Sequence, residues 1–431
     1  MSSGEEPKKP TNPWLSKGTS SLFQGVAKRA PETSTPKPEI NKQSIVYDKK
    51  PILTDYFIHP SSNEEEGLNE SLSQVRSYIE NIEGDMDMIC KEGDEMTDFG
   101  VFEGYETVGF VNEGNNCYQN SVIQCLLHFP PLFRFLKELS QRLNGVDNPY
   151  SPFLTLFLRI VDRMKQSFSE KREMHSRVHL SELRELIAVR NVMFAEEQSD
   201  VQEFFLYLLE ELAKEVESFA PSVEAVPIED EDAWSEIGSG GRKVIIHEAI
   251  VKQNIVNSLF ETQLRKESRS YSKRQLVEQQ SFLTLSLPIA SSSIESVGDA
   301  LSLFLSGSYD SKQGAYRIEQ SPPCLVIQLM RFIYSRKLQR PVKIQKPVAF
   351  EQELDLSDYD LFDTAKYAKY ELFGVIAHQG TELMKGHYVS YCRVSEGFDG
   401  WVCCNDQWVR EISYQEVLHA EPYMLFYRAV K

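Results

Sequence analysis

The feature that most constrains the fold is a change of pattern partway along the 431-residue chain. From about Tyr105 to about residue 219 the apolar residues recur at helical spacing, most clearly in SDVQEFFLYLLEELAKEVESF, where Ser199 or Asp200 can cap the helix. Farther on, short β-branched or aromatic runs alternate with turn residues, as in SFLTLSLPI, PPCLVIQLMRFIY and GHYVSYCRV. A helical half followed by an antiparallel-sheet half predicts an α+β fold of two packed lobes, with a site in the cleft between them.

The segment before this region has a different composition. Residues 1–104 are rich in Pro, Ser, Thr, Lys and Glu, and we expect a mostly disordered regulatory tail there. One short helix is predicted in LNESLSQVRSYIENI, because Leu72, Val75, Ile79 and Ile82 share one helical face; a transient helix in a linker is the simpler interpretation. The folded domain is predicted to span residues 105–431, with an acidic loop insertion at about 220–242.

Charge and cysteine content narrow the class of protein. The formal charge of −18 argues against direct nucleic-acid binding and favours a basic partner. No apolar run reaches the length of a membrane span, and the N-terminus lacks the apolar core of a signal peptide. Seven cysteines without framework spacing indicate a reduced compartment, the cytosol or the nucleus.

One cysteine stands where a nucleophile is expected. Cys117 follows the Gly-containing turn NEGNN and begins a predicted helix, whose N-terminus favours a thiolate and offers N–H groups to an oxyanion. His387 begins the predicted strand in KGHYVSYCRV and can serve as the base, while Asn405 and Asp406 end the next strand and can orient it. This order, helix-start Cys, strand His and next-strand Asn or Asp, is the layout of a papain-like thiol hydrolase.

Several motifs together resemble the ubiquitin-specific protease family. GFVNEGNNCYQNSVIQCL is similar to the cysteine box of that family, and EEQSDVQEFFLYLLEEL is similar to its second box. FLTLSLPI and PPCLVIQLMRF resemble its central strands, and YELFGVIAHQGTELMKGHYVSYCR with GWVCCNDQWV and PYMLFYR resembles its histidine box. The resemblance runs in the family's order over about residues 105–430. It implies a papain-like fold with a helical thumb, a β-rich palm and fingers, and a catalytic cleft between thumb and palm.

The resemblance also implies a reaction and roles for individual residues. The expected activity is hydrolysis of the bond after the C-terminal glycine of ubiquitin, through a thioester, so ubiquitin and ubiquitinated proteins are the expected partners. By position, Cys117 is the nucleophile, His387 the general base, Asn405 the third member with Asp406 as support, and Asn112 the oxyanion-hole residue. The residues expected to contact substrate are Gln198, Asp200, Glu203 and His378. The implied chemistry uses no cofactor and no metal.

The chain departs from the family where the fingers are expected. Many members carry two Cys-x-x-Cys pairs that bind zinc, whereas Arg269 and Ser272 stand near the first pair's positions here and no second pair precedes Pro322. We therefore expect fingers that are metal-free or shortened. Two alternatives stay open: a protease for a ubiquitin-like modifier, and a catalytically inactive ubiquitin-binding scaffold.

The tail contains one further short motif. KPILTDYF, residues 50–57, resembles the peptide that docks on the DNA sliding clamp, with Leu53, Tyr56 and Phe57 as a hydrophobic plug and Lys50 in place of the usual Gln. An aromatic patch that packs on the domain, or has no role, is the alternative interpretation.

Overall fold

The computed structural model describes the following parts of the chain: residues 62–90, 99–143, 151–170, 177–190, 194, 199–219, 235–236, 244–248, 254–269, 275–308, 315–335, 338–359, 361–362, 365–382, 385–395 and 400–430. Several predictions lie outside these residues: the disordered tail over 1–61 and 91–98 with its clamp-like motif at 50–57, Gln198, Ser272, and the acidic insertion at 220–242 except for 235–236.

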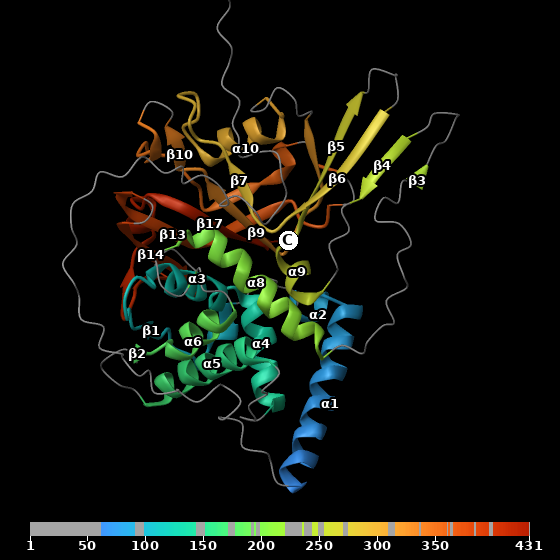
Figure 1. Cartoon of the computed structure of the whole chain (residues 1–431), viewed down its shortest axis with the longest axis vertical. Coiled ribbons are helices and arrows are strands. Elements are labelled where there is room, and N and C mark those ends of the chain that lie inside the picture. The colour runs from blue at the N-terminus through green and yellow to red at the C-terminus, as the bar shows by residue number, and fades with distance from the viewer. Residues whose placement is uncertain are drawn as a thin grey trace, which may run out of the picture. The chain divides into compact units, whose positions relative to one another are not determined.

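The first half of the described chain is helical, as the sequence predicts. Figure 1 shows these helices gathered on one side of the strands β13, β14 and β17. Their bounds are α1 Ser62–Gly84, α2 Asp87–Cys90, η2 Phe99–Phe102, α3 Cys117–Leu127, α4 Pro130–Leu143, α5 Pro152–Glu170, α6 Ser181–Arg190, α8 Val201–Glu217 and α9 Ile255–Phe260. Every residue of α3 is buried, because this helix lies between the other helices and β14.

The second half forms a large, mainly antiparallel sheet with strand order β16-β15-β14-β13-β17-β9-β7, in which β12 also pairs with β13. Among the described strands of this sheet, β7 and β9 are the one pair that runs in parallel. The strands are β7 Leu285–Leu287, β9 Cys324–Leu329, β12 Glu353–Asp355, β13 Lys369–Glu382, β14 Lys385–Arg393, β15 Trp401–Asn405, β16 Trp408–Ile412 and β17 Pro422–Val430. The short helices α10 Val297–Leu305, η3 Leu356–Asp358 and α11 Tyr414–Leu418 belong to this half.

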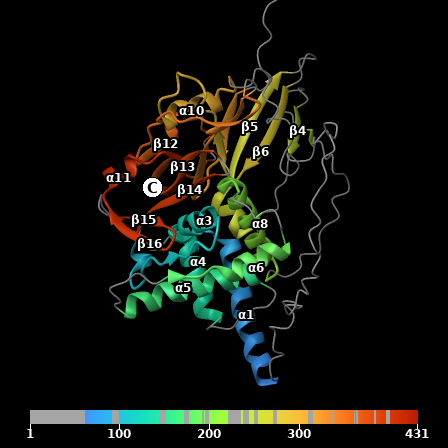
Figure 2. The ribbon, with the colours of Figure 1, turned by 60° about the vertical axis from the view of Figure 1, so that its left-hand side comes forward.

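The described residues also form three smaller sheets. The five-stranded sheet has the order β3-β4-β6-β5-β8 and corresponds to the expected fingers, while β1 pairs with β2 and β10 pairs with β11. Figure 2 shows β4, β5 and β6 on the side of the large sheet away from α4, α5 and α6. The bounds are β1 Gly109–Phe110, β2 Arg177–Val178, β3 Ser235–Glu236, β4 Val244–Glu248, β5 Thr262–Arg269, β6 Gln275–Phe282, β8 Tyr316–Gln320, β10 Phe332–Ser335 and β11 Arg340–Lys343.

Aromatic side chains join the helices to the large sheet. Phe129, just after α3, stacks on Phe373 of β13 with ring centroids 5.4 Å apart. Phe205 of α8 meets Phe426 of β17 edge to face at 5.6 Å. All four rings are buried, and burial of such side chains is the main favourable contribution to joining two lobes. The two halves therefore pack through one apolar interface.

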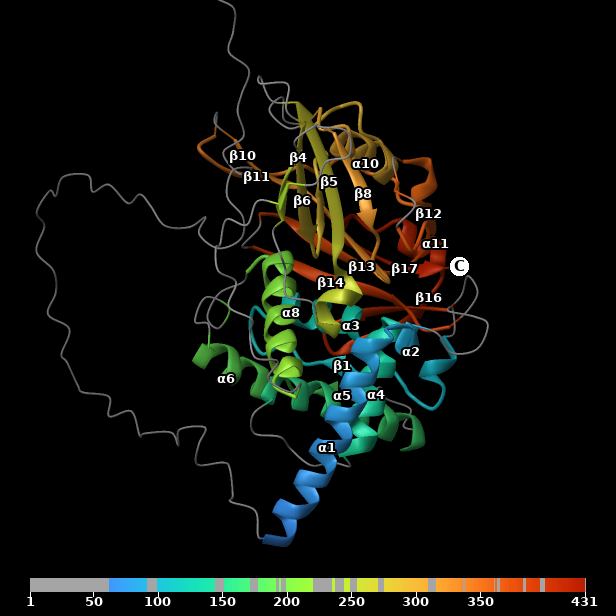
Figure 3. The same cartoon turned by 90° about the vertical axis from the view of Figure 1, so that its right-hand side faces the viewer.

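Helix α1 extends the folded region beyond the predicted boundary at residue 105. Of the predicted apolar face, Val75, Ile79 and Ile82 are 0% exposed and Leu72 is half-buried. Tyr78 stacks on Phe135 of α4 at 6.2 Å. Figure 3 shows α1 running alongside α4. The chain is thus helical over residues 62–84 and 87–90, and α1 packs through Val75, Tyr78, Ile79 and Ile82, where the sequence indicated a tail with a transient helix. The partner surface on α4, which stabilises α1, is what the local pattern did not reveal.

Candidate active site

Cys117 is the first residue of α3, as predicted. The preceding loop turns sharply at Gly114 and Asn115, whose φ angles are 121° and 58°. Two side-chain amides hold this turn: Asn116 Oδ1 accepts from the Glu113 N–H at 3.0 Å, and Asn112 Oδ1 accepts from the Gly114 N–H at 3.1 Å. The thiol is 3% exposed and lies at the positive end of the helix dipole, next to N–H groups that have no partner within the helix.

His387 lies beside this thiol although 270 positions separate the two residues. It belongs to β14 and pairs with Gln379 of β13, so two strands fix its backbone. A hydrogen bond with Cys117 is the largest cause that raises the pKa of His387 to about 9, and Asn405 and the Asp406 carboxylate add to it against the effect of burial. An imidazolium with a raised pKa next to a thiol is the arrangement that stabilises a thiolate nucleophile.

Asn405 and Asp406 have different partners. The Asn405 Oδ1 atom lies 2.7 Å from His387 Nε2, and because an amide oxygen only accepts, Nε2 carries the proton and Nδ1 is left for the thiol. The Asp406 carboxylate is 3.9 Å from Nε2. Asn405 is therefore the group that orients the base, and Asp406 acts on the imidazole by its charge.

Asp406 connects the histidine side of the site to the cysteine side. Its Oδ2 accepts from Asn112 Nδ2 and its Oδ1 from Asn120 Nδ2, both at 2.8 Å. Its own carbonyl accepts from the Phe110 N–H at 3.0 Å. Asn120 was not among the predicted site residues, although it stands one helical turn after Cys117 in CYQNS; its partner is 286 positions away, and no local pattern shows that contact.

Asp200 and Glu203 lie at the start of α8. Asp200 caps this helix, as predicted, accepting from the N–H groups of Gln202 and Glu203, and its other oxygen accepts from the Tyr423 hydroxyl. Burial raises the pKa of Asp200 against these bonds. Glu203 is exposed, and partial loss of hydration together with the Asp200 charge raises its pKa. The Asp200 carboxylate is thus engaged within the protein, whereas that of Glu203 is accessible. Tyr423 was not predicted as a site residue.

His378, predicted to contact substrate, lies behind the site surface. Its ring is 1% exposed and is bordered by Phe332 at 5.3 Å and Tyr388 at 4.8 Å. Burial, with the nearby Lys343 and His387 charges, lowers the pKa of His378 to about 4, so its ring is neutral. A substrate contact of His378 stays a prediction.

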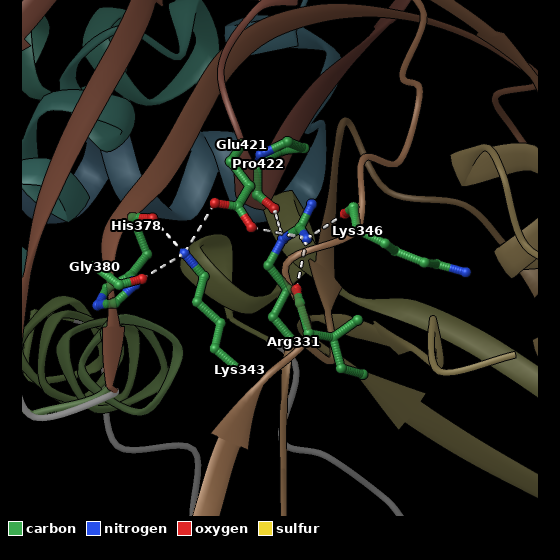
Figure 4. Close-up of polar contacts among 8 residues, drawn as sticks. Arg331, Lys343, Lys346, His378, Gly380, Glu421 and Pro422 are labelled. Atoms are coloured by element: carbon green, nitrogen blue, oxygen red, sulfur yellow. Dashed lines mark hydrogen bonds and ion pairs between the residues drawn. The ribbon is translucent and has the colours of Figure 1, made fainter. Parts of the chain in front are cut away.

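A buried ionic cluster, not predicted from the sequence, supports this region (Figure 4). Lys343, whose side chain is 1% exposed, donates to the His378 and Gly380 carbonyls at 2.7 and 3.1 Å and to Glu421 at 3.0 Å. Arg331, 0% exposed, contacts the same carboxylate at 3.3 Å and donates to the carbonyls of Ile344, Lys346 and Pro422. The cluster ties the β10–β11 hairpin to β13 next to the partner of His387.

The other cysteines are buried or half-buried. Cys125, Cys324 and Cys392 are 0% exposed and Cys403 is half-buried. Burial raises the pKa of Cys324 and Cys392 well above the ordinary thiol value, which disfavours the reactive thiolate. Within the described residues no group of three or more His, Cys, Asp or Glu side chains is arranged to hold a metal ion. Among the described helices, none combines the length and apolar character needed to cross a membrane.

Known proteins share both this sequence pattern and this fold. "Ubiquitin carboxyl-terminal hydrolase 24" of Arabidopsis thaliana is 25% identical over 360 residues, covering 75% of this chain and 64% of the relative. "Ubiquitin carboxyl-terminal hydrolase 10" of Rattus norvegicus is 25% identical over 385 residues, covering 75% of this chain and 48% of the relative. The chain therefore spans between about half and two thirds of the length of these two relatives.

The fold is likewise similar to solved structures. The structure described as the "SAGA Ubp8/Sgf11/Sus1/Sgf73 DUB module bound to ubiquitin aldehyde" aligns with a TM-score of 0.56 and 22% identity, covering 81% of this chain and 74% of that chain. The prediction of an α+β papain-like fold is thereby confirmed. The sequence profile of the family described as "Ubiquitin carboxyl-terminal hydrolase" matches residues 108–427, which contain all the residues of the Cys117–His387 site. The chain belongs to the ubiquitin carboxyl-terminal hydrolase family.

Proposed function

We propose that this chain is a deubiquitinating cysteine protease that hydrolyses the peptide or isopeptide bond after the C-terminal glycine of ubiquitin. The observation that carries the proposal is the position of the His387 imidazole beside the Cys117 thiol, with Asn405 Oδ1 2.7 Å from the imidazole Nε2. Family membership supports ubiquitin as the modifier. The cysteines are free thiols, which favours a reducing compartment, the cytosol or the nucleus.

In the acylation step, the Cys117 thiolate attacks the carbonyl carbon of the terminal glycine and its electron pair forms the carbon–sulfur bond. The oxyanion would be met by N–H groups at the start of α3 and by Asn112, whose Nδ2 has a second hydrogen besides the one donated to Asp406. The His387 imidazolium then gives its proton to the departing lysine amine as the carbon–nitrogen bond breaks, which leaves a thioester.

In the deacylation step, neutral His387 removes a proton from a water molecule that attacks the thioester carbonyl. The thiolate leaves, and ubiquitin is released with a free carboxylate. Asn405 keeps the imidazole aligned in both steps, because Nε2–H stays bonded to its Oδ1 while Nδ1 exchanges the proton. No step requires a metal.

Glu203 is the carboxylate best placed to bind an arginine in the basic tail of ubiquitin. Asp200 has both oxygens engaged by the α8 cap and by Tyr423, so we assign it the task of holding the start of α8. An exposed carboxylate with no such constraint can form a charge-assisted pair with a guanidinium. We expect Glu203→Gln to raise KM and leave kcat nearly unchanged.

The test uses ubiquitin that carries a thiol-reactive electrophile at its C-terminus, with parallel probes built on ubiquitin-like modifiers. We expect labelling by the ubiquitin probe alone, and loss of that labelling in Cys117→Ala; Cys125→Ala is the matched control, because it removes a buried thiol from the same helix. Labelling by another modifier would instead indicate a protease for that modifier. Folded wild-type protein that takes up no probe would contradict the proposed activity.

A further inference from the structure

Trp408 is an exposed tryptophan next to the catalytic residues. Its side chain is 59% exposed, whereas Trp401 in the preceding strand is 1% exposed. It is the backbone partner of Asn405 across the tight β15–β16 hairpin, and directly opposed residues of an antiparallel pair project on the same face. The indole thus stands beside the residue that orients His387.

The hairpin that carries Trp408 is fixed relative to the nucleophile. A Cβ atom at Gly109 would lie 2.3 Å from the Gln407 carbonyl oxygen, so β1 and the hairpin are in backbone contact there. The bonds from Phe110 N–H and Asn112 Nδ2 to Asp406 hold the same hairpin to the loop before Cys117. The position of the indole is therefore set by the same contacts that assemble the site.

Arg177 completes an exposed surface at this place. It belongs to β2, the partner of β1, and its guanidinium lies over the Trp408 ring at 4.6 Å from the centroid. Such a stack restrains both side chains. Together they present an apolar face and a positive charge side by side.

The order of the strands separates this surface from the start of α8. His387 lies on β14, Asn405 on β15 and Trp408 on β16, whereas Asp200 contacts Tyr423 on β17, beyond β13 on the other side. Figures 2 and 3 both show α3 between α8 and the edge of the sheet that ends in β16. The nucleophile is flanked by α8 on one side and by the Trp408 surface on the other.

The two sides of a scissile bond extend in opposite directions from the attacked carbonyl carbon. If the ubiquitin tail runs past Glu203 at α8, as the proposed function has it, the departing lysine lies toward the β15–β16 hairpin. We propose that Trp408 and Arg177 bind the polypeptide that carries the modified lysine. The indole contacts an apolar side chain near that lysine and the guanidinium pairs with a neighbouring carboxylate. This inference rests on the proposed function.

The experiment compares three substrates that share ubiquitin and differ in the leaving group. These are ubiquitin aminocoumarin, ubiquitin joined to the lysine of a peptide with leucine and aspartate on both sides, and ubiquitin joined to the same peptide with glycine at those positions. We expect wild type to cleave the leucine–aspartate substrate with a higher kcat/KM than the glycine substrate. Trp408→Ala should lower kcat/KM on the leucine–aspartate substrate about tenfold relative to aminocoumarin, equivalent to about 1.4 kcal/mol.

Two further variants make the result specific. The quantity compared is the ratio of kcat/KM on the leucine–aspartate substrate to kcat/KM on ubiquitin aminocoumarin. Trp408→Phe should recover part of this ratio. Leu418→Ala, which truncates an exposed apolar residue of the nearby α11, should leave it at the wild-type value. An equal loss on all three substrates, or an unchanged ratio in Trp408→Ala, would overturn the inference while the proposed function stands. Absence of aminocoumarin release by wild type would overturn the proposed function, and this inference with it.

Discussion

Glu421 is the carboxylate shared by two cations that solvent hardly reaches. Lys343 is 3.0 Å and Arg331 3.3 Å from its two oxygens, and the side chains of these cations are 1% and 0% exposed. Two cations and one carboxylate leave one excess positive charge on the three side chains, whose contacts are drawn in Figure 4. Replacing Glu421 by Gln keeps the shape of the side chain and leaves two buried cations without a counter-ion.

The size of the effect follows from these distances. At an effective dielectric constant of about 20, each contact contributes roughly 5 kcal/mol of Coulomb attraction before desolvation is subtracted. Breaking a buried pair by removing one partner costs about 3–5 kcal/mol. Because the Glu421 side chain retains 35% exposure, solvent screening places the expected loss for Glu421→Gln near the lower limit, about 3 kcal/mol.

Lys343→Met should cost less, about 1–2 kcal/mol, because it removes one of two cations and leaves the Arg331–Glu421 pair in place. The double variant should be more stable than Glu421→Gln alone, since it no longer buries an unpaired ammonium group. Urea unfolding followed by circular dichroism measures all three, and a loss of about 3 kcal/mol should lower the midpoint by about 1 M. A double variant as unstable as the sum of the two single changes would refute the reasoning.

Three further predictions concern the site itself. Cys117→Ala removes the largest cause of the raised His387 pKa, so an NMR titration should show this imidazole losing its proton well below the wild-type pKa of about 9. In the wild type, the His387 imidazolium adds folding stability that is complete below pH about 6.5 and is lost as the pH rises through about 9. Asn405→Ala should lower kcat about a hundredfold with KM little changed, as steady-state hydrolysis of ubiquitin aminocoumarin would measure. Gly109→Ala should cost about 1–3 kcal/mol in urea unfolding and lower kcat as well, because its Cβ would meet the Gln407 carbonyl; wild-type behaviour would contradict that contact.

The residues that could be found from the sequence are those whose role follows from the pattern of the residues next to them. Cys117 follows a Gly-containing turn and begins a helix, and His387 begins a strand, so local patterns place both at element starts. The α8 cap at Asp200 is equally local, because its carboxylate accepts hydrogen bonds from the N–H groups of the residues two and three positions later. The succession of a helical half and a strand half likewise sufficed for the fold class.

The remaining parts depend on contacts between distant segments. The bonds from Tyr423 to Asp200 and from Asn120 to Asp406 join residues more than 200 positions apart. The sequence around either residue of such a pair does not indicate which distant residue it will contact. The same holds for α1: its apolar face is evident in the sequence, but the surface of α4 that buries Ile79 is created only by folding.

The last described strand, β17, is an interior strand of the large sheet, with β13 on one side and β9 on the other. During synthesis it leaves the ribosome after all the other described elements, so until then β13 and β9 lack the strand that joins them. Tyr423 and Phe426, which contact α8, arrive with it. A nascent chain therefore lacks these contacts between α8 and the large sheet until residues 422–430 have been made. The order of the strands thus makes the joining of β13 to β9 the last step of sheet assembly among the described elements.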